Sequence, residues 1–174
     1  AVSNAGAATF GSGSSGVSGL VSPANSLVGS IADNVVGLSA TALTNGNYVI
    51  GSYNWRGAEA SFRTATGAAT WVDGLTGFTS NGQGLISQNN SLLGFNTSDM
   101  VGYNITALSN GNYVVGSPFC DNGAITNAGA VTWGNGLGGT VTSSVGFVSA
   151  TNSLVGSVSN DYVGASGYGG GNSM

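Results

Sequence analysis

The sequence repeats itself, and this constrains the fold more than any other feature. The segment ATALTNGNYVIGS, residues 40–52, returns as ITALSNGNYVVGS, residues 105–117. The segment NSLVGSIADNVVG, residues 25–37, returns in modified form at residues 90–102 and 152–164. A period of 61–65 residues predicts structural units that stack on one another and share a core.

The copies divide the chain into three parts that together form one repeat domain. These parts are a partial repeat at 1–39, a repeat at 40–104 and a repeat with a degenerate Gly-rich end at 105–174. On this alignment the first copy begins inside a repeat and the last copy breaks off, so we expect incomplete sheets at both ends. Exposed strand edges attract partners. The pattern therefore predicts contacts with other copies of the chain or with the rest of a longer chain.

Each unit has the pattern of short β-strands separated by turns. Asn-Gly pairs at 45–46 and 110–111 favour hairpins with a type I′ turn, which needs positive φ at both central residues. No segment has the 3.6-residue apolar period of a helix. We therefore predict an all-β fold of β-propeller-type blades, with four to five short antiparallel strands each, in an incomplete ring. A β-solenoid is the alternative.

The composition removes most catalytic chemistry. The 174 residues include 32 Gly but no His, and only 5% are charged. Without His there is no Ser-His-Asp or Cys-His site, and without Lys there is no Schiff-base amine or P-loop. Two arginines do not supply the cationic surface that nucleic acids require. We expect a protein that is not an enzyme, with no nucleic-acid partner.

The same composition indicates where the protein is located. A surface of amides and hydroxyls with a near absence of thiols is common outside the cell, so we predict an extracellular or cell-surface protein of bacterial type. Cys120 has no second cysteine to pair with, so we expect a buried thiol, the alternative being a link between two chains. We identify no signal peptide, and no stretch approaches the roughly 20 apolar residues of a membrane span.

The repeat resembles the FG-GAP blades of the integrin α-chain propeller. Val101-Gly102 stands for the Phe-Gly step, 109–112 for the turn, and 114–118 for the Gly-Ala-Pro strand end. The segments NAGAVTWGNG and NSLVGS are similar to repeats of very large secreted bacterial haemagglutinin-like adhesins. This resemblance implies propeller-type blades. FG-GAP blades often hold calcium in an Asp-rich loop, but here the loop is Asn-Gly-Asn, so we expect no metal and no cofactor.

Recurring acidic and aromatic positions have structural and functional interpretations. Asp99 and Asp161 are equivalent, and Asn34 replaces them in the first copy. This replacement favours turn carboxylates bonded to backbone N–H groups over a metal or catalytic site. Large aromatic residues share one repeat position and are expected to pack between sheets, the alternative being platforms for sugar stacking. They are Phe10, Trp71 and Trp133.

One segment departs from the repeat. Between the two strands that flank it, the middle unit has 18 residues (53–70) where the last unit has 15 (118–132). The longer segment holds both arginines and the only glutamate. Such a variable loop is a candidate contact surface, the alternative being a loop held by its own Arg-Glu pair. The candidate contact residues are Tyr53, Trp55, Arg56, Glu59, Phe62 and Arg63.

Two functions are compatible with these observations. The first is a non-enzymatic extracellular structural or adhesive repeat protein that self-assembles or is part of a larger surface adhesin or filament. Its partner is itself or the rest of a longer chain. The alternative is a propeller lectin that binds glycans.

Overall fold

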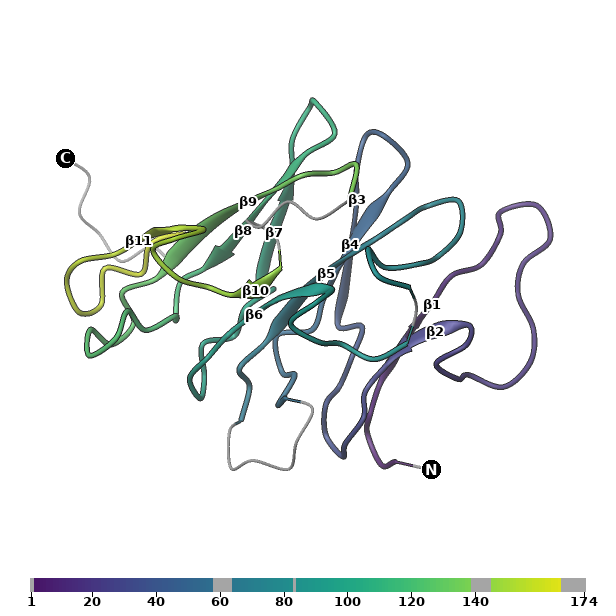
Figure 1. The fold of residues 1–174 in the computed structure, drawn as a ribbon, viewed down its shortest axis with the longest axis horizontal. Helices are drawn as coiled ribbons and strands as arrows, with labels where there is room; N and C mark the ends of the chain where they lie inside the picture. The colour runs from purple at the N-terminus through teal and green to yellow at the C-terminus, as the bar shows by residue number, and fades with distance from the viewer. Residues whose placement is uncertain (1, 58–63, 83, 139–144, 167–174) are drawn as a thin grey trace.

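The computed structural model describes residues 2–57, 64–82, 84–138 and 145–166, and their regular structure is entirely β. The sheets lie side by side along the molecule, with β1 and β2 at one end and β11 at the other (Figure 1). The strands are β1 (Ala7–Thr9), β2 (Ser26–Val28), β3 (Ser39–Ala42), β4 (Tyr48–Gly51), β5 (Ala68–Val72), β6 (Ser91–Leu93), β7 (Asn104–Ala107), β8 (Tyr113–Ser117), β9 (Ala130–Gly134), β10 (Gly146–Phe147) and β11 (Leu154–Val155).

Three sheets form, one for each repeat. Sheet 1 is β1-β2, sheet 2 is β10-β6-β5-β4-β3, and sheet 3 is β11-β9-β8-β7. Sheets 2 and 3 share an antiparallel order of four short strands. None of these sheets closes into a barrel within the described residues. The prediction of an all-β repeat domain is confirmed.

The second and third repeats each pair a short segment with the sheet before them. Strand β10 belongs to the third repeat but pairs in parallel with β6 of the second. The Val148 N–H continues this pairing and donates to the Leu93 carbonyl at 3.0 Å. One junction earlier, the Val28 N–H donates to the Gly84 carbonyl at 3.0 Å. Backbone hydrogen bonds therefore tie adjacent sheets together at both junctions.

The hydrophobic core lies between the sheets. Successive residues of a strand point to opposite faces, so Val49 packs toward sheet 3 and Ile50 toward sheet 1. Sheet 2 is therefore buried on both faces. The cluster between sheets 2 and 3 contains Leu43, Val49, Ala69, Leu92, Val101, Tyr113, Val115, Cys120 and Ala130. The cluster between sheets 1 and 2 contains Leu27, Val36, Ile50, Trp55, Ala68, Val72, Ile86 and Leu93.

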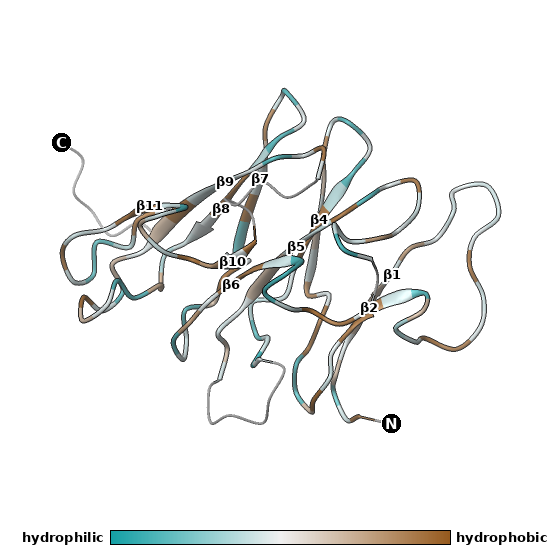
Figure 2. Ribbon diagram, in the orientation of Figure 1, coloured by the Kyte–Doolittle hydropathy of each residue, from teal (hydrophilic) through white to brown (hydrophobic). Residues whose placement is uncertain are grey.

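The two Asn-Gly hairpins are present, but the predicted type I′ turn is wrong. The Leu43 N–H donates to the Asn47 carbonyl at 2.8 Å and the Gly46 N–H to the Leu43 carbonyl at 3.1 Å, which leaves a three-residue loop. Gly46 has φ +90°, whereas Asn45 stays outside the positive-φ region. The Asn45 side chain instead accepts the Asn47 N–H at 3.1 Å and holds the turn. Hydrophilic residues gather at both hairpin tips (Figure 2).

A polar relay of Thr, Ser and Asn links the strands of each unit. In the second repeat the hydroxyls of Thr70 and Ser91 lie 2.7 Å apart, and the Ser91 hydroxyl donates to Asn90 Oδ1 at 2.9 Å. Asn90 Oδ1 also accepts the Ser87 N–H at 2.9 Å, while its Nδ2 donates to the Leu85 carbonyl at 3.0 Å. The relay holds the segment 85–87, which precedes β6, by its backbone. Equivalent relays use Asn25 and Asn152.

Recurring glycines allow the backbones to approach closely. Gly67 has φ +81°, and a Cβ at this position would overlap the backbone nitrogen of Val101. The Gly94 N–H donates to the Gly67 carbonyl at 3.2 Å. Gly6 and Gly129 occupy the same position in the other repeats, with φ +71° and +73°. The glycine is required because no side chain fits between the paired segments.

Candidate functional site

The side of sheet 3 that faces away from sheet 2 is apolar and partly exposed. Val114 lies directly opposite Trp133 in the β8–β9 ladder, and Val131 lies opposite Leu154 in the β9–β11 ladder. Directly opposed residues share a face, as do residues two apart on one strand. We call these four residues the outer face. Trp133 is 43% exposed and Leu154 is 76% exposed.

The equivalent face of sheet 2 is buried. Leu92 is the repeat equivalent of Leu154, yet only 1% of it is exposed because sheet 3 covers it. Trp71, the equivalent of Trp133, is half-buried and packs against the same core. The prediction that these aromatic residues lie between sheets therefore holds for Trp71 but is wrong for Trp133. Trp133 lies on a sheet that no further sheet covers among the described residues.

Polar contacts accompany the covered face of sheet 2. The Gly136 carbonyl, in the turn after β9, accepts three side-chain donors from the preceding repeat. Trp71 Nε1 donates to it at 3.0 Å, Asn45 Nδ2 at 2.8 Å and Asn47 Nδ2 at 2.7 Å. A single turn of one repeat is thereby recognised by an indole and two amides of the previous one.

The third repeat carries the same three donor groups at its outer face. Trp133, Asn110 and Asn112 are the equivalents of the indole and the two amides. Asn112 still uses its oxygen within its own repeat, where it accepts the Gly136 N–H at 3.1 Å. The side-chain nitrogens of all three residues lack an acceptor among the described residues. The outer face thus combines apolar side chains with unused donors in the arrangement of the internal junction.

Asp99 joins the second and third repeats. Its Oδ2 accepts the backbone N–H groups of Phe95 at 2.8 Å and Asn96 at 2.7 Å, and its Oδ1 accepts the Asp121 N–H of the next repeat at 3.1 Å. Burial raises the pKa of this carboxyl above its usual range, and the three N–H donors offset part of that rise. The interpretation of Asp99 as a turn carboxylate is confirmed.

The repeat equivalents of Asp99, which are Asn34 and Asp161, also accept hydrogen bonds from backbone N–H groups. Asn34 Oδ1 accepts the Arg56 N–H of the following repeat at 3.2 Å. Asp161 is exposed, and its Oδ2 accepts the N–H groups of Ser157 at 3.1 Å and Val158 at 2.9 Å. Its Oδ1, the atom that corresponds to the inter-repeat acceptor of Asp99, has no donor among the described residues. Asp161 Oδ1 therefore has no inter-repeat partner among the described residues, at the position where Asp99 contacts the next repeat.

The structure separates the members of the predicted contact loop. Trp55 is only 5% exposed and belongs to the core between sheets 1 and 2, where it is the repeat equivalent of Cys120. Arg56 forms an ion pair with Asp33 of the preceding repeat at 3.5 Å, with both side chains partly exposed. Tyr53 packs edge-to-face on Tyr103. Glu59, Phe62 and Arg63 lie outside the described residues.

Tyr53 begins a row of aromatic rings that crosses the second junction. The ring centroids of Tyr53 and Tyr103 are 5.3 Å apart, those of Tyr103 and Phe119 are 6.0 Å apart, and those of Phe119 and Tyr162 are also 6.0 Å apart. All three pairs are edge-to-face. The sequence pattern did not reveal this row because its members occupy different repeat positions, and the residue type at each position changes between copies.

Cys120 is buried with a free thiol, as expected for the buried interpretation. Desolvation is the main cause that raises the pKa of the thiol far above its usual value. Within the described residues, no group of three His, Cys, Asp or Glu side chains could hold a metal ion. In the same part of the chain, no helix has the length and apolar character needed to cross a membrane.

These features define a tandem β-repeat protein, in which equivalent positions of successive units form β-strands and polar contacts with the neighbouring unit. The chain belongs to the family described as "Repeat of unknown function (DUF5650)", which matches residues 1–38, 42–103 and 107–165. The predicted internal repeat is thus confirmed, while the FG-GAP type stays a prediction. No curated protein and no solved structure matched the chain.

Proposed function

We propose that this chain is a non-enzymatic structural or adhesive repeat protein that assembles by stacking its sheets on those of neighbouring copies. The observation that supports the proposal best is the outer face. Trp133 and Leu154 are exposed and Val114 and Val131 are half-buried. Of their repeat equivalents, Val49, Ala69 and Leu92 are buried between sheets 2 and 3, and Trp71 is half-buried there. A face of this composition is favourable only when it is covered.

Apolar burial and polar contacts would each contribute to association through this face. Burying a large aliphatic or aromatic side chain contributes about 1.5–3 kcal/mol, so covering Leu154 and Trp133 offsets only part of the roughly 4–15 kcal/mol cost of association. The side-chain nitrogens of Asn110, Asn112 and Trp133, and Asp161 Oδ1, which have no partner among the described residues, would add directional contacts. With a net charge of only −4, copies repel each other weakly.

The residue pattern supports a more specific blade type and cellular location for this protein. Four-stranded antiparallel sheets stacked in series support the resemblance to FG-GAP blades. The nearly uncharged composition and its likeness to secreted adhesin repeats support a place at a bacterial cell surface. Under this proposal the chain contributes a section of an adhesin or filament, and its residues do no chemistry.

The test compares two exposed leucines. Leu154→Asp places a charge on the outer face, whereas Leu20→Asp changes a side chain that is 90% exposed in the loop between β1 and β2. Analytical ultracentrifugation of the wild-type chain should show a mass that rises with concentration through the micromolar range. We expect Leu154→Asp to remain monomeric and Leu20→Asp to behave as wild type. A wild-type chain that stays monomeric throughout, or a Leu154→Asp variant that assembles normally, would refute the proposal.

The aromatic row favours glycan binding as a second candidate function. Tyr103 is 40% exposed and Tyr162 is 38% exposed, and aromatic rings at a surface can pack against the apolar faces of sugars. A cavity of about 170 Å³ lies beside the row, lined by Pro118, Phe119, Tyr162 and Ala165. A glycan array tests this candidate. Reproducible binding that Tyr103→Ala abolishes and Leu20→Asp preserves would favour a lectin, and an array without binding would remove the candidate.

A further inference from the structure

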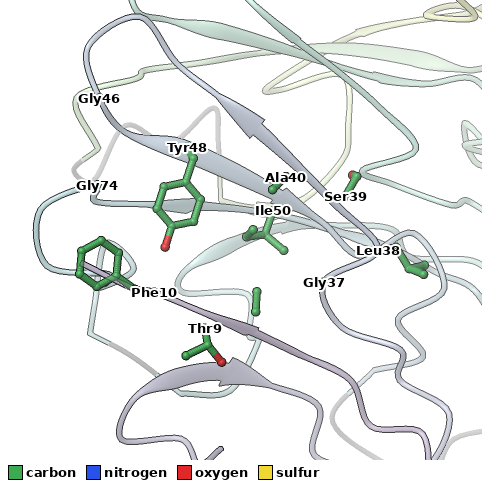
Figure 3. A pocket seen from close by; sticks show the side chains of 12 residues that line it. Thr9, Phe10, Gly37, Leu38, Ser39, Ala40, Gly46, Tyr48, Ile50 and Gly74 are labelled. Atoms are coloured by element: carbon green, nitrogen blue, oxygen red, sulfur yellow. The ribbon is translucent and has the colours of Figure 1, made fainter. Parts of the chain in front are cut away.

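A cavity of about 540 Å³ lies between β1 and the β3–β4 hairpin, at the opposite end of the molecule from the outer face. Tyr48 and Ile50 extend from β4 toward β1, where Thr9 and Phe10 lie, and Ala40 lies beside them on β3 (Figure 3). No residue that lines the cavity carries a charge. The cavity therefore suits an uncharged, partly apolar ligand.

The second junction shows what occupies the equivalent space. There the β3–β4 hairpin places Leu43, which is 5% exposed, and Val49, which is fully buried, against sheet 3. Tyr113, the repeat equivalent of Tyr48, is 2% exposed beneath this hairpin. At the first junction Tyr48 is only half-buried, and the core cluster has no equivalent of Leu43 or Val49 among the described residues.

The backbone at this cavity is also incompletely paired. Strand β5 pairs with β4 on one side and β6 on the other. Strand β1 is the repeat equivalent of β5, but it pairs only with β2 among the described strands. Ala8 and Thr9 of β1 line the cavity, so the strand has one edge free beside it. An open edge next to an apolar cavity is the arrangement that accepts an added β-strand.

We propose that this cavity binds a β-hairpin of the repeat's own sequence, supplied by a second polypeptide that carries the repeat. The internal register gives the geometry. Because Val49 pairs with Trp71 and Ile50 with Thr70, the valine after the donor's tyrosine lies opposite Phe10, and the next residue lies opposite Thr9. The donor's strand pairs antiparallel with β1, and its leucine and valine complete the core cluster. This inference does not depend on assembly through the outer face.

The test is a titration with a synthetic peptide. The peptide has the sequence of residues 105–117, ITALSNGNYVVGS, with a terminal fluorophore, and anisotropy reports its binding to the folded chain. The titration is repeated with the Leu154→Asp chain, so that association through the outer face does not contribute. A control peptide carries aspartate in place of Leu108 and Val114, the equivalents of the two core residues. We expect saturable one-to-one binding of the first peptide and affinity weakened by at least about tenfold for the control, because its charges would be buried unpaired.

A pair of protein variants locates the binding site. Ala40 is exposed, so Ala40→Asp leaves the fold intact but puts a charge into the cavity, and we expect binding to weaken by at least about tenfold. Ala40→Ile copies Ile105 of the next repeat and should preserve binding. Hydrogen exchange should slow at Ala7–Thr9 when the peptide binds. The proposal is overturned if the peptide does not saturate the chain, if the control peptide binds equally, if Ala40→Asp has no effect, or if only a glycan or the intact folded chain protects β1.

Discussion

Asn90→Ala tests whether the polar relay stabilises the repeat in proportion to its burial. Asn90 is 3% exposed and bonds to the Leu85 carbonyl, the Ser87 N–H and the Ser91 hydroxyl. Alanine removes every one of these contacts and leaves the backbone groups without a substitute. The other two relays provide matched comparisons, since Asn25 and Asn152 make the same contacts but are half-buried.

The expected loss of stability follows from the backbone groups that lose their hydrogen-bond partner. A buried polar group left without its partner costs roughly 1–3 kcal/mol. Asn90→Ala leaves the Ser87 N–H and the Leu85 carbonyl without their partner. The Ser91 hydroxyl keeps its contact with Thr70. We therefore expect a loss of about 3 kcal/mol in the free energy of unfolding. At Asn25 and Asn152 water can replace the lost contacts, so we expect about 1 kcal/mol at each.

Thermal unfolding followed by circular dichroism measures this difference. For a chain of this size, 1 kcal/mol corresponds to a shift in Tm of roughly 2–4 °C. Asn90→Ala should lower Tm about threefold more than Asn25→Ala or Asn152→Ala does. Equal shifts for all three variants would show that burial of the relay does not set its contribution, and the reasoning would be refuted.

Three further predictions concern buried groups at the junctions. Burial raises the pKa of Asp99 in the folded state above its value in the unfolded chain, so the folded state binds the proton more tightly. The free energy of unfolding should therefore fall as the pH rises from about 4 through the raised pKa. Urea titrations should show this slope in the wild type and not in Asp99→Asn. Cys120 should resist a disulfide reagent until the chain is unfolded, since its thiol is buried and its pKa is raised; rapid labelling of the native chain would contradict this. Gly67→Ala should cost at least about 2 kcal/mol in urea unfolding, while Gly13→Ala, where a Cβ meets nothing within 4 Å, should stay within about 0.5 kcal/mol of wild type.

The sequence predicted what recurs in every copy. The repeat period located the sheets, and the Asn-Gly pairs located the hairpins at 43–47 and 108–112. The replacement of an aspartate by Asn34 correctly indicated a structural role for Asp99, because an amide oxygen can accept the same backbone N–H. The turn type was mispredicted because the Asn45 side chain bonds to the backbone and favours the three-residue loop.

Features that depend on one particular junction could not be predicted. Strand β10 contains only Gly146 and Phe147, and nothing in so short a segment indicates that it pairs in parallel with β6 of the preceding repeat. The aromatic row joins residues that differ between copies, so the repeat alignment hides it. Trp55 is in a segment of unusual composition, but it occupies the buried position that Cys120 fills in the next repeat. The structure shows that this position is buried in both repeats.

The chemistry of the outer face supports the proposal that it forms a junction with a further sheet. Leu92 and Leu154 are the same residue type at the same repeat position, yet 1% of one and 76% of the other are exposed. The difference therefore arises from the neighbouring sheet and not from the residue. Stacked repeats that end at solvent need a polar outer face to stay soluble. Sheet 3 instead keeps Leu154 and Trp133, along with donors that match a turn like the one at Gly136. These residues are the ones that a further sheet of the same repeat would bury, which favours assembly over an isolated chain.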